Sequence, residues 1–149
     1  MSQTSLPHAA LLFQSLRISR DRLGVRSKVA IGTGLLRVLL AEAIRNQPFD
    51  EAFYREANPD LDAAFRRGEI VDLHEHFIEQ GYLEGRVAAR PLVDEAFYLA
   101  TYKDVRDAMR RGDITSAQEH YLRAGAAEGR LANPAQRPVA DRWAAILAE

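Results

Sequence analysis

The chain has 149 residues, of which 47% are hydrophobic and 28% charged, and its formal net charge at pH 7 is −1. This composition is typical of a soluble globular protein of one domain or two small ones, and it excludes a disordered or fibrous chain. The chain has no cysteine, which excludes disulfides and Cys-ligated metal sites, and the near-neutral charge gives no reason to expect a nucleic-acid partner.

The charge is distributed unevenly along the chain. Residues 1–47 contain seven Arg or Lys and two Asp or Glu, whereas residues 48–132 contain eleven basic and seventeen acidic residues. The basic segment can dock on the acidic body, meet an acidic partner, or contact phosphate or anionic lipid. The plainest interpretation is an Arg-rich helix face in solvent, so membrane contact is not expected.

The N-terminal segment, 1–47, predicts two helices, over residues 8–23 and 27–46, because leucines recur at helical spacing in both. The glycines of "GTG" at 32–34 interrupt the second pattern, either as a kink or as the true start of the helix with Thr33 as its cap. The apolar stretch 29–44 includes charged residues and is shorter than the roughly 20 apolar residues of a spanning helix.

No secretory signal is evident at the N-terminus. We therefore expect the protein to be cytoplasmic as made, or to leave the cell without a signal as part of a released or surface-attaching assembly.

Residues 49–132 contain one unit twice. Phe49–Ala88 aligns without a gap on Val93–Ala132 at an offset of 44 residues, and 18 of the 40 pairs are identical. The shared phrases are "DEAFY", "RRG", "EH" and "EGR". Similarity at one fixed offset indicates two copies of a single structural unit, at 48–90 and 91–132.

Each copy predicts three short helices. Asp50 and Asp94 precede the first helix as N-caps. In the first copy "NPD" ends that helix and places Asn58 as the cap of the second helix. Gly68 and Gly112 end the second helix, because glycine readily takes the left-handed conformation that closes a helix.

The third helix of each copy begins with the spacing of a capping box. Asp72-x-x-Glu75 and Ser116-x-x-Glu119 both fit this motif, in which the glutamate reaches back to the amide of the cap residue. The repeated glutamate thus has a structural explanation.

The same helix carries a histidine on its inward face. One side of a regular helix carries Leu73, His76, Phe77 and Gln80, and Gly81 ends the helix. His120 takes the corresponding place in the second copy, and both histidines are expected to be core or half-buried residues whose polar atoms are satisfied.

After the copies, residues 133–149 predict a linker, "NPAQRP", and an amphipathic helix with Trp143, Ile146 and Leu147 on one side. No run of alternating β-branched residues occurs, so the predicted fold class is all-α. Two tandem three-helix repeats are few for a stacked array. The N-terminal and C-terminal helices are therefore expected to cap the ends of the repeat core.

No catalytic or metal-binding constellation stands out. "HEH" at 74–76 is not repeated, and residues two apart on a helix do not face each other. Serine-nucleophile and phosphate-loop motifs are absent. We therefore predict that the protein is not an enzyme, and we expect no catalytic residue, metal or cofactor.

Some repeated side chains remain candidates for lining a ligand-binding groove, and the surface made where the two copies meet is where we expect a functional site. Neighbouring rings such as Phe53 and Tyr54 point about 100° apart on a helix. One ring can then be buried while the other borders the surface and stacks on a sugar; alternatively, both pack between helices. Arg86 is expected to pair with carboxylates or free carbonyls. The candidates are Tyr54, Tyr98, His76, His120, Arg86 and Arg130.

The unit "FDEAFYREANPDL…HFIEQGYLEGR" resembles a bacterial helical repeat phrased as an aspartate with "YY" or "FY", then "NPD", "HY" or "HF", and "G…EGR". The resemblance covers residues 49–132, although the second copy has "YKD" in place of "NPD". Such repeats accompany bacterial glycosyltransferases and other proteins of surface-polysaccharide synthesis, export or recognition. No catalytic residue is assigned to the repeat.

The resemblance implies a non-catalytic module that binds bacterial surface polysaccharide or docks on a polysaccharide-handling protein. The alternative is a structural subunit of a larger assembly, such as a homo-oligomer or a particle, in which the repeats are protein–protein interaction surfaces.

Overall fold

The computed structural model describes residues 7–24 and 28–148. All regular structure in these two ranges is helical, without a strand, which confirms the predicted all-α class. The chain divides into two compact units, Met1–Gln47 and Pro48–Glu149. The division falls where the charge of the sequence changes from basic to acidic.

The first unit contains α1 (Ala9–Leu16), the 3₁₀ turn η1 (Arg20–Gly24) and α2 (Thr33–Arg45). The helix predicted over 8–23 is therefore too long. Arg17 follows α1 with a φ of 54°, and its amide donates to carbonyls of the last turn. This left-handed residue closes the helix, and the next residues, Ile18 and Ser19, are weak helix formers.

The helix predicted over 27–46 is also too long, at its N-terminal end. It begins at Thr33, so "GTG" marks its start, with Gly32 rather than Thr33 in the cap position. Val29 and Ile31 are β-branched and precede the two glycines, and both residue types weaken a helix. Residues 25–27 lie outside the described part of the chain.

In the second unit the two copies fold into the same order of elements. In the first copy these are α3 (Glu51–Ala57), α4 (Pro59–Arg66), α5 (Leu73–His76) and the π-helical turn η2 (Phe77–Gly81). In the second they are α6 (Glu95–Thr101), α7 (Lys103–Arg111), α8 (Ala117–His120) and the π-helical turn η3 (Tyr121–Gly125).

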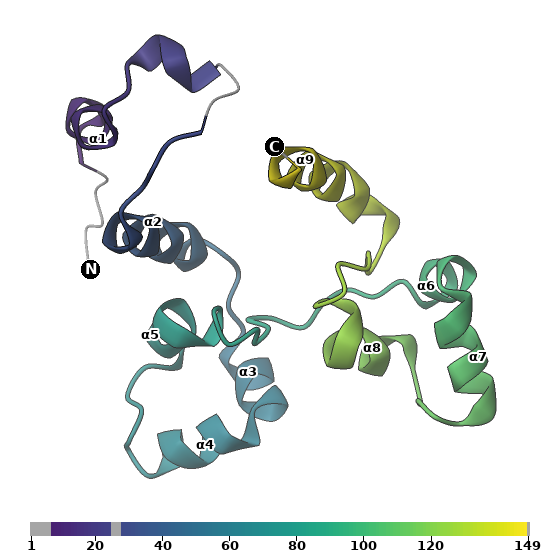
Figure 1. Cartoon of the computed structure of the whole chain (residues 1–149). Helices are drawn as coiled ribbons and strands as arrows, with labels where there is room; N and C mark the ends of the chain where they lie inside the picture. Colours follow the sequence, from purple (N-terminus) through teal and green to yellow (C-terminus); the bar gives the residue numbers. More distant parts are fainter. Residues whose placement is uncertain (1–6, 25–27, 149) are drawn as a thin grey trace. The chain divides into compact units, whose positions relative to one another are not determined.

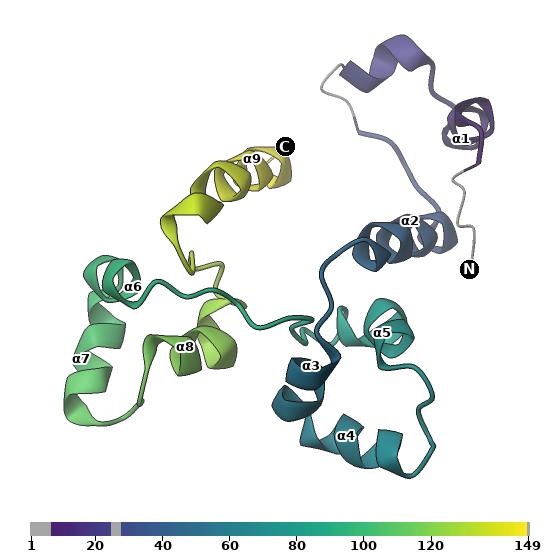
Figure 2. The same cartoon turned by 180° about the vertical axis from the view of Figure 1, so that it is seen from behind.

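Each copy forms its own cluster of helices, and an extended segment joins the two clusters (Figures 1 and 2). Both copies close on themselves with the same backbone hydrogen bond. The amide of Asp50 donates to the carbonyl of Ala88 at 3.0 Å, and that of Asp94 donates to the carbonyl of Ala132 at 2.9 Å.

The first-helix caps are as predicted from the sequence. The carboxylates of Asp50 and Asp94 each accept a hydrogen bond at 3.0 Å from the amide three residues later. Asn58 takes the predicted cap position of α4, but its side chain makes no capping bond there. Gly112 closes α7 with a φ of 82°.

Only half of the predicted capping box holds in the second copy. Asp72 and Ser116 accept from the amides of Glu75 and Glu119 at 2.9 and 3.0 Å. The Glu119 carboxylate, however, accepts from the amide and hydroxyl of Thr115, one residue before the cap. The repeated glutamate therefore still stabilises the helix start, through a different amide.

The third helix departs from a regular α-helix, because one α turn passes into a π-helical turn. A π turn takes more residues than an α turn, so the buried face shifts along the chain. Leu73, Phe77, Ile78 and Gly81 are buried, whereas Gln80 is exposed. The inward position predicted for Gln80 is therefore wrong.

Each copy has a small core with a tyrosine at its centre. In the first copy Tyr54 is buried with Leu61, Leu73 and Phe77. In the second copy the buried cluster contains Tyr98, Val105, Ile114 and Ala117. The tyrosines occupy equivalent positions, and both have an exposed fraction of 0%.

The segment after the second copy was predicted to be a linker, but hydrogen bonds attach it to the second copy. Asn133 donates to the carbonyl of Leu92 at 2.8 Å, and Gln136 accepts from the amide of Ala132 at 2.7 Å. These bonds hold the short 3₁₀ turn η4 (Pro134–Gln136), which leads into α9 (Arg137–Leu147).

The predicted apolar side of α9 is exposed. Trp143, Ile146 and Leu147 are 54%, 51% and 79% exposed, and no side chain of the helix is buried. The prediction that this helix covers an end of the repeat core is therefore wrong, whereas capping by the N-terminal helices stays a prediction. No described helix is long and apolar enough to cross a membrane.

Candidate functional site

The repeated histidines are bonded to the buried tyrosines. The Tyr54 hydroxyl lies 3.3 Å from Nδ1 of His76, and the Tyr98 hydroxyl lies 3.0 Å from Nδ1 of His120. Burial raises the pKa of both tyrosines to about 12. The phenols therefore keep their protons at neutral pH, and each can donate to the imidazole nitrogen beside it.

This arrangement corrects the predicted role of Tyr54 and Tyr98. Neither ring lines a groove or can stack on a sugar, because both side chains are completely buried. Phe53 is only 3% exposed, so both rings of the first pair pack between helices, which was the alternative interpretation. Of the two states expected for His76 and His120, core or half-buried, the structure shows the half-buried one, with a hydrogen bond at Nδ1 of each.

The tyrosine hydroxyl also explains a repeated glycine. A Cβ placed on Gly81 would collide with the hydroxyl of Tyr54, and one on Gly125 would collide with that of Tyr98. We call each set of three residues a Tyr–His–Gly lock: Tyr54, His76 and Gly81 in the first copy, and Tyr98, His120 and Gly125 in the second. The lock ties the first helix of a copy to the π turn of its third helix.

The repeated arginines form a second structural device. Arg86 donates to both carboxylate oxygens of Asp60, at 3.0 and 3.3 Å, and to Glu84 at 2.7 Å. Arg130 donates to both oxygens of Asp104 at 2.8 and 3.0 Å. The predicted pairing of Arg86 with carboxylates is confirmed. Hydrogen bonds from the arginines hold the pKa of Asp60 and of Asp104 below the usual value.

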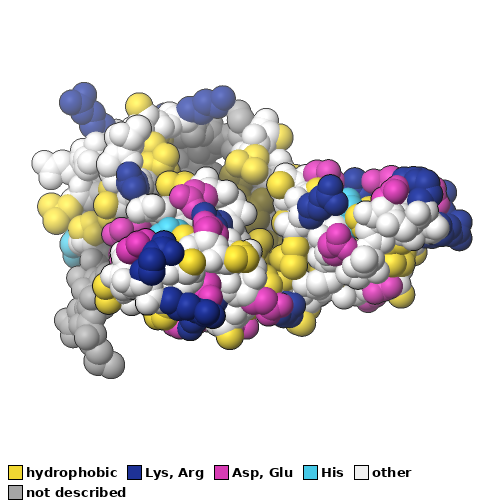
Figure 3. Space-filling model, turned by 90° about the horizontal axis from the view of Figure 1, so that it is seen from below, with side chains coloured by type: hydrophobic (Ala, Val, Ile, Leu, Met, Phe, Trp, Pro, Cys, Tyr) yellow, Lys and Arg dark blue, Asp and Glu magenta, His cyan; other side chains and the backbone are white. Residues whose placement is uncertain are grey.

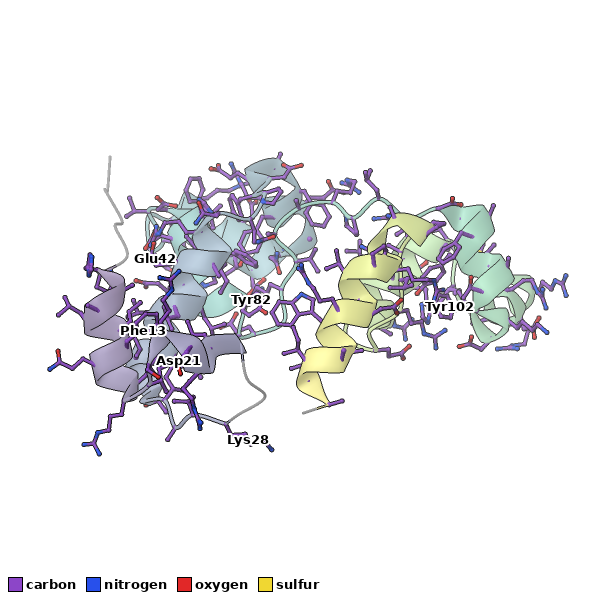
Figure 4. All side chains as sticks on the ribbon, turned by 90° about the horizontal axis from the view of Figure 1, so that it is seen from above. Phe13, Asp21, Lys28, Glu42, Tyr82 and Tyr102 are labelled. Atoms are coloured by element: carbon purple, nitrogen blue, oxygen red, sulfur yellow. The ribbon has the colours of Figure 1, made fainter. Side chains whose placement is uncertain are left out.

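The "NPD" to "YKD" difference between the copies changes the surroundings of this arginine. Asn58 donates to the carbonyl of Tyr54 at 2.7 Å and accepts from Arg86 at 2.8 Å. Tyr102 stands in its place, among the helices of the second copy (Figure 4). Its ring lies 4.9 Å from the guanidinium of Arg130, and its hydroxyl accepts from the amide of Leu131 at 2.7 Å.

A groove of about 430 Å³ opens where the two copies meet, and we call it the inter-copy groove. The first copy contributes the end of α3 and the chain after η2, and the second contributes α8 and η3. Of the six predicted site residues, only Arg86 lines it. Its lining residues are Ala57, Asn58, Gly85, Arg86, Val87, Glu119, Leu122 and Arg123.

The inter-copy groove places a carboxylate and a guanidinium side by side. Hydrogen bonds from Thr115, and secondarily the charge of Arg123, lower the pKa of Glu119, so Glu119 is ionised at neutral pH. Across the described residues, no carboxylate forms an ion pair with Arg123. Its guanidinium is therefore the one cation of the groove whose hydrogen bonds are not already used by acidic side chains.

The charged side chains on the face seen in Figure 3 are mixed in sign, with Lys and Arg beside Asp and Glu. A second hollow, of about 620 Å³, is lined by residues 90–94 among others, but its charged groups have internal roles. Arg90 pairs with Glu56 at 2.6 Å, and Asp94 caps α6. The inter-copy groove is thus the better candidate site.

Sequence reasoning missed Glu119, Leu122 and Arg123. The repeat indicated that a surface forms where the copies meet, but the residues on that surface depend on how one copy packs against the next. No group of three or more His, Asp or Glu side chains suited to a metal occurs in residues 7–24 and 28–148.

Comparison with protein-family models, with curated proteins and with solved structures found no match to this chain. The resemblance to a bacterial helical repeat therefore stays a prediction from its motifs.

Proposed function

We propose that this chain is a non-catalytic helical binding module that acts with bacterial cell-surface polysaccharide, and that the inter-copy groove receives the glycan. The resemblance of the repeat to those of polysaccharide-handling proteins supports the setting. The observation that carries the site is that Arg123, which forms no ion pair with a carboxylate of the described residues, lines an open groove between the copies together with the ionised Glu119.

The chemistry of the groove suits a hydroxyl-rich ligand. The Arg123 guanidinium can donate two parallel hydrogen bonds to neighbouring sugar hydroxyls. The Glu119 oxygen that does not bond Thr115 can accept a hydrogen bond from a further hydroxyl. Leu122 and Val87 add apolar surface beside these groups. A volume of about 430 Å³ falls within the range of small-ligand sites, about 300–1,000 Å³.

The repeated residues of the motif support this function indirectly. The Tyr–His–Gly locks and the Arg–Asp pairs hold each copy in shape, and the groove depends on two correctly shaped copies meeting. Arg86 belongs to both groups, because it binds Asp60 and Glu84 and also lines the groove. In this proposal the other five predicted site residues maintain the fold of each copy and do not contact the glycan.

Calorimetric titration with oligosaccharides cut from the host's own capsule or exopolysaccharide tests the proposal. Arg123→Gln removes the available cation of the groove, and loss of a charged hydrogen bond of about 1.5–3 kcal/mol weakens binding by about 10–100-fold. Arg110→Gln is the matched control, because Arg110 is exposed, lies in the same copy and does not line the groove.

The proposal fails if the wild-type chain binds none of these oligosaccharides. It fails equally if Arg123→Gln and Arg110→Gln bind as tightly as the wild type while circular dichroism shows both to be folded.

A second candidate is a structural subunit of a larger assembly, and the exposed apolar side of α9 favours it. Val139 and Trp143 lie one turn apart on the helix, with Ile146 and Leu147 on the next turn, and all four side chains are exposed. Light scattering over a range of concentrations would show self-association that Trp143→Ser with Ile146→Ser abolishes. A monomer at all concentrations would argue against a homo-oligomer.

A further inference from the structure

The first unit, Met1–Gln47, is rich in apolar side chains but forms almost no core. Among its described residues only Ile44 is buried. Leu11 and Leu23 are 60% and 62% exposed, and further apolar side chains on and before α2 are also exposed. These are Val29, Leu36 and Val38. An apolar surface of this kind is typical of a binding surface rather than of a free domain.

Basic side chains lie exposed among these apolar residues. Arg17, Arg20, Arg22 and Lys28 are all exposed, and none forms an ion pair with a carboxylate in the part of the chain that the structure describes. The one nearby acid, Asp21, accepts a hydrogen bond from the Ser19 side chain, which lowers its pKa. Lys28 extends away from α1 and α2 (Figure 4).

In the second unit most basic side chains form ion pairs. Nine of the eleven basic residues between 48 and 132 form ion pairs with carboxylates. The absence of ion pairs at Arg17, Arg20, Arg22 and Lys28 is therefore not a general property of the described part of this protein. These four side chains leave a concentrated positive charge on the same segment that exposes leucines and valines.

We propose that Met1–Gln47 binds the surface of an anionic lipid bilayer. Exposed leucines and valines would enter the boundary between headgroups and acyl chains, while the arginines and Lys28 bind lipid phosphates. A nucleic acid would supply phosphates for the cations but no apolar environment for the leucines, whereas an anionic bilayer supplies both. This departs from the expectation drawn from charge alone, because the joint exposure of both residue classes is visible only in the structure.

This inference does not depend on the polysaccharide proposal, because it concerns a different unit and different residues. A lipid-bound N-terminal unit would hold the repeat unit at a membrane surface whatever the repeats bind. The two proposals can therefore fail separately.

Co-sedimentation of the full chain with vesicles tests the inference. We expect binding to vesicles of phosphatidylcholine and phosphatidylglycerol at a 3:1 ratio and much weaker binding to pure phosphatidylcholine. Salt at about 1 M should weaken binding, because it shortens the screening length to about 3 Å. Arg17→Gln with Arg20→Gln and Arg22→Gln should weaken it by about fivefold for each arginine, or about 100-fold together.

The apolar contribution needs its own variant. Leu11→Ser with Leu23→Ser changes only exposed side chains, and it should weaken binding while leaving the helical content unchanged. The matched control is Arg66→Gln with Arg110→Gln and Arg111→Gln, which removes the same charge from exposed, ion-paired arginines of the second unit. This control should bind vesicles as the wild type does.

The inference is overturned if the wild-type chain does not bind the anionic vesicles, or binds both vesicle types equally. It is also overturned if both triple arginine variants bind alike. Tighter binding to a DNA duplex than to vesicles, with no effect of the leucine changes, would replace it with a nucleic-acid surface.

Discussion

Gly81→Ala is the sharpest test of the Tyr–His–Gly lock. The added methyl would collide with the Tyr54 hydroxyl and lie 3.2 Å from Cδ2 of Phe77. Tyr54 is completely buried, so its ring has little room to withdraw. Either the π turn moves or the hydroxyl leaves His76, and both changes destabilise the first copy.

The magnitude follows from three contributions. Overpacking of a buried site costs about 1–3 kcal/mol, and loss of the Tyr54–His76 hydrogen bond costs about 1 kcal/mol more. Alanine recovers up to about 1 kcal/mol, because it favours helix over glycine. We therefore expect Gly81→Ala to lower the free energy of unfolding by about 2 kcal/mol, measured by urea unfolding followed by circular dichroism.

A double-mutant cycle with Tyr54→Phe identifies the cause. Tyr54→Phe alone should cost about 1 kcal/mol, and in its background Gly81→Ala should cost at least about 1 kcal/mol less, because the colliding oxygen is gone. Gly68→Ala is the control, since Gly68 has a φ of 73° and open space around it. Its backbone penalty of about 1–2 kcal/mol should not change with Tyr54→Phe. Additive effects of Gly81→Ala and Tyr54→Phe would refute the lock.

Two further predictions concern pH. Hydrogen bonds from Arg86 and Arg130 lower the pKa of Asp60 and Asp104, so their contribution to stability is present above about pH 4 and lost as pH falls below it. Asp60→Asn with Asp104→Asn should lower the free energy of unfolding by about 0.5–1 kcal/mol per exposed ion pair at pH 7. The double variant should also show a weaker loss of this free energy as pH falls below about 4. A pH dependence identical to that of the wild type would contradict the pairing. Burial raises the pKa of Tyr54 and Tyr98 to about 12. The stabilisation of the folded state by these two protonated tyrosines is therefore fully present below about pH 10 and is lost between about pH 10 and 12. Absorbance of the phenolates and helical content should change together in that window, and Tyr54→Phe with Tyr98→Phe should remove the late step.

The local features of the fold could be predicted from sequence because their causes lie within four residues. Asp50 and Asp94 cap the first helices as their positions predict, and Gly112 closes α7 in the left-handed conformation. A cap needs only a side-chain oxygen and a nearby free amide. The amide predicted to bond Glu119 was wrong, because the Glu119 carboxylate accepts from the amide of Thr115 and not from that of the cap residue Ser116.

Features that depend on packing could not be predicted. The π turn moves Gln80 outward and Ile78 inward, whereas a regular helical period places Gln80 inside. Tyr54 and Phe53 are neighbours on one helix, and the rings that cover Tyr54 come from outside that helix, namely Phe49 and Phe77. The guanidinium of Arg90 lies over the Phe53 ring. The repeated glycine at 81 was assigned to helix termination, although its main cause is the Tyr54 hydroxyl from 27 residues earlier.

The candidate site was located only in outline. The sequence indicated a surface where the copies meet, and Arg86 does lie there. Glu119 has a capping explanation and Arg123 is not repeated in the first copy, where Glu79 takes its place. Residues were predicted as site residues because they occur in both copies, and most of these repeated residues stabilise the fold. A groove between two copies is lined by a different face of each copy, so its residues need not be repeated.

The most direct test of the proposed function is a nuclear magnetic resonance titration of the ¹⁵N-labelled chain with a defined oligosaccharide from the host's surface polysaccharide. If the groove receives the glycan, the largest shifts should fall on the amides of Gly85, Val87 and Leu122 and on Nε of Arg123, with saturating, concentration-dependent behaviour. The amides around the two locks should change little. Shifts confined to α9 or to the first unit, or no shifts at all, would contradict the assignment of the glycan to the inter-copy groove.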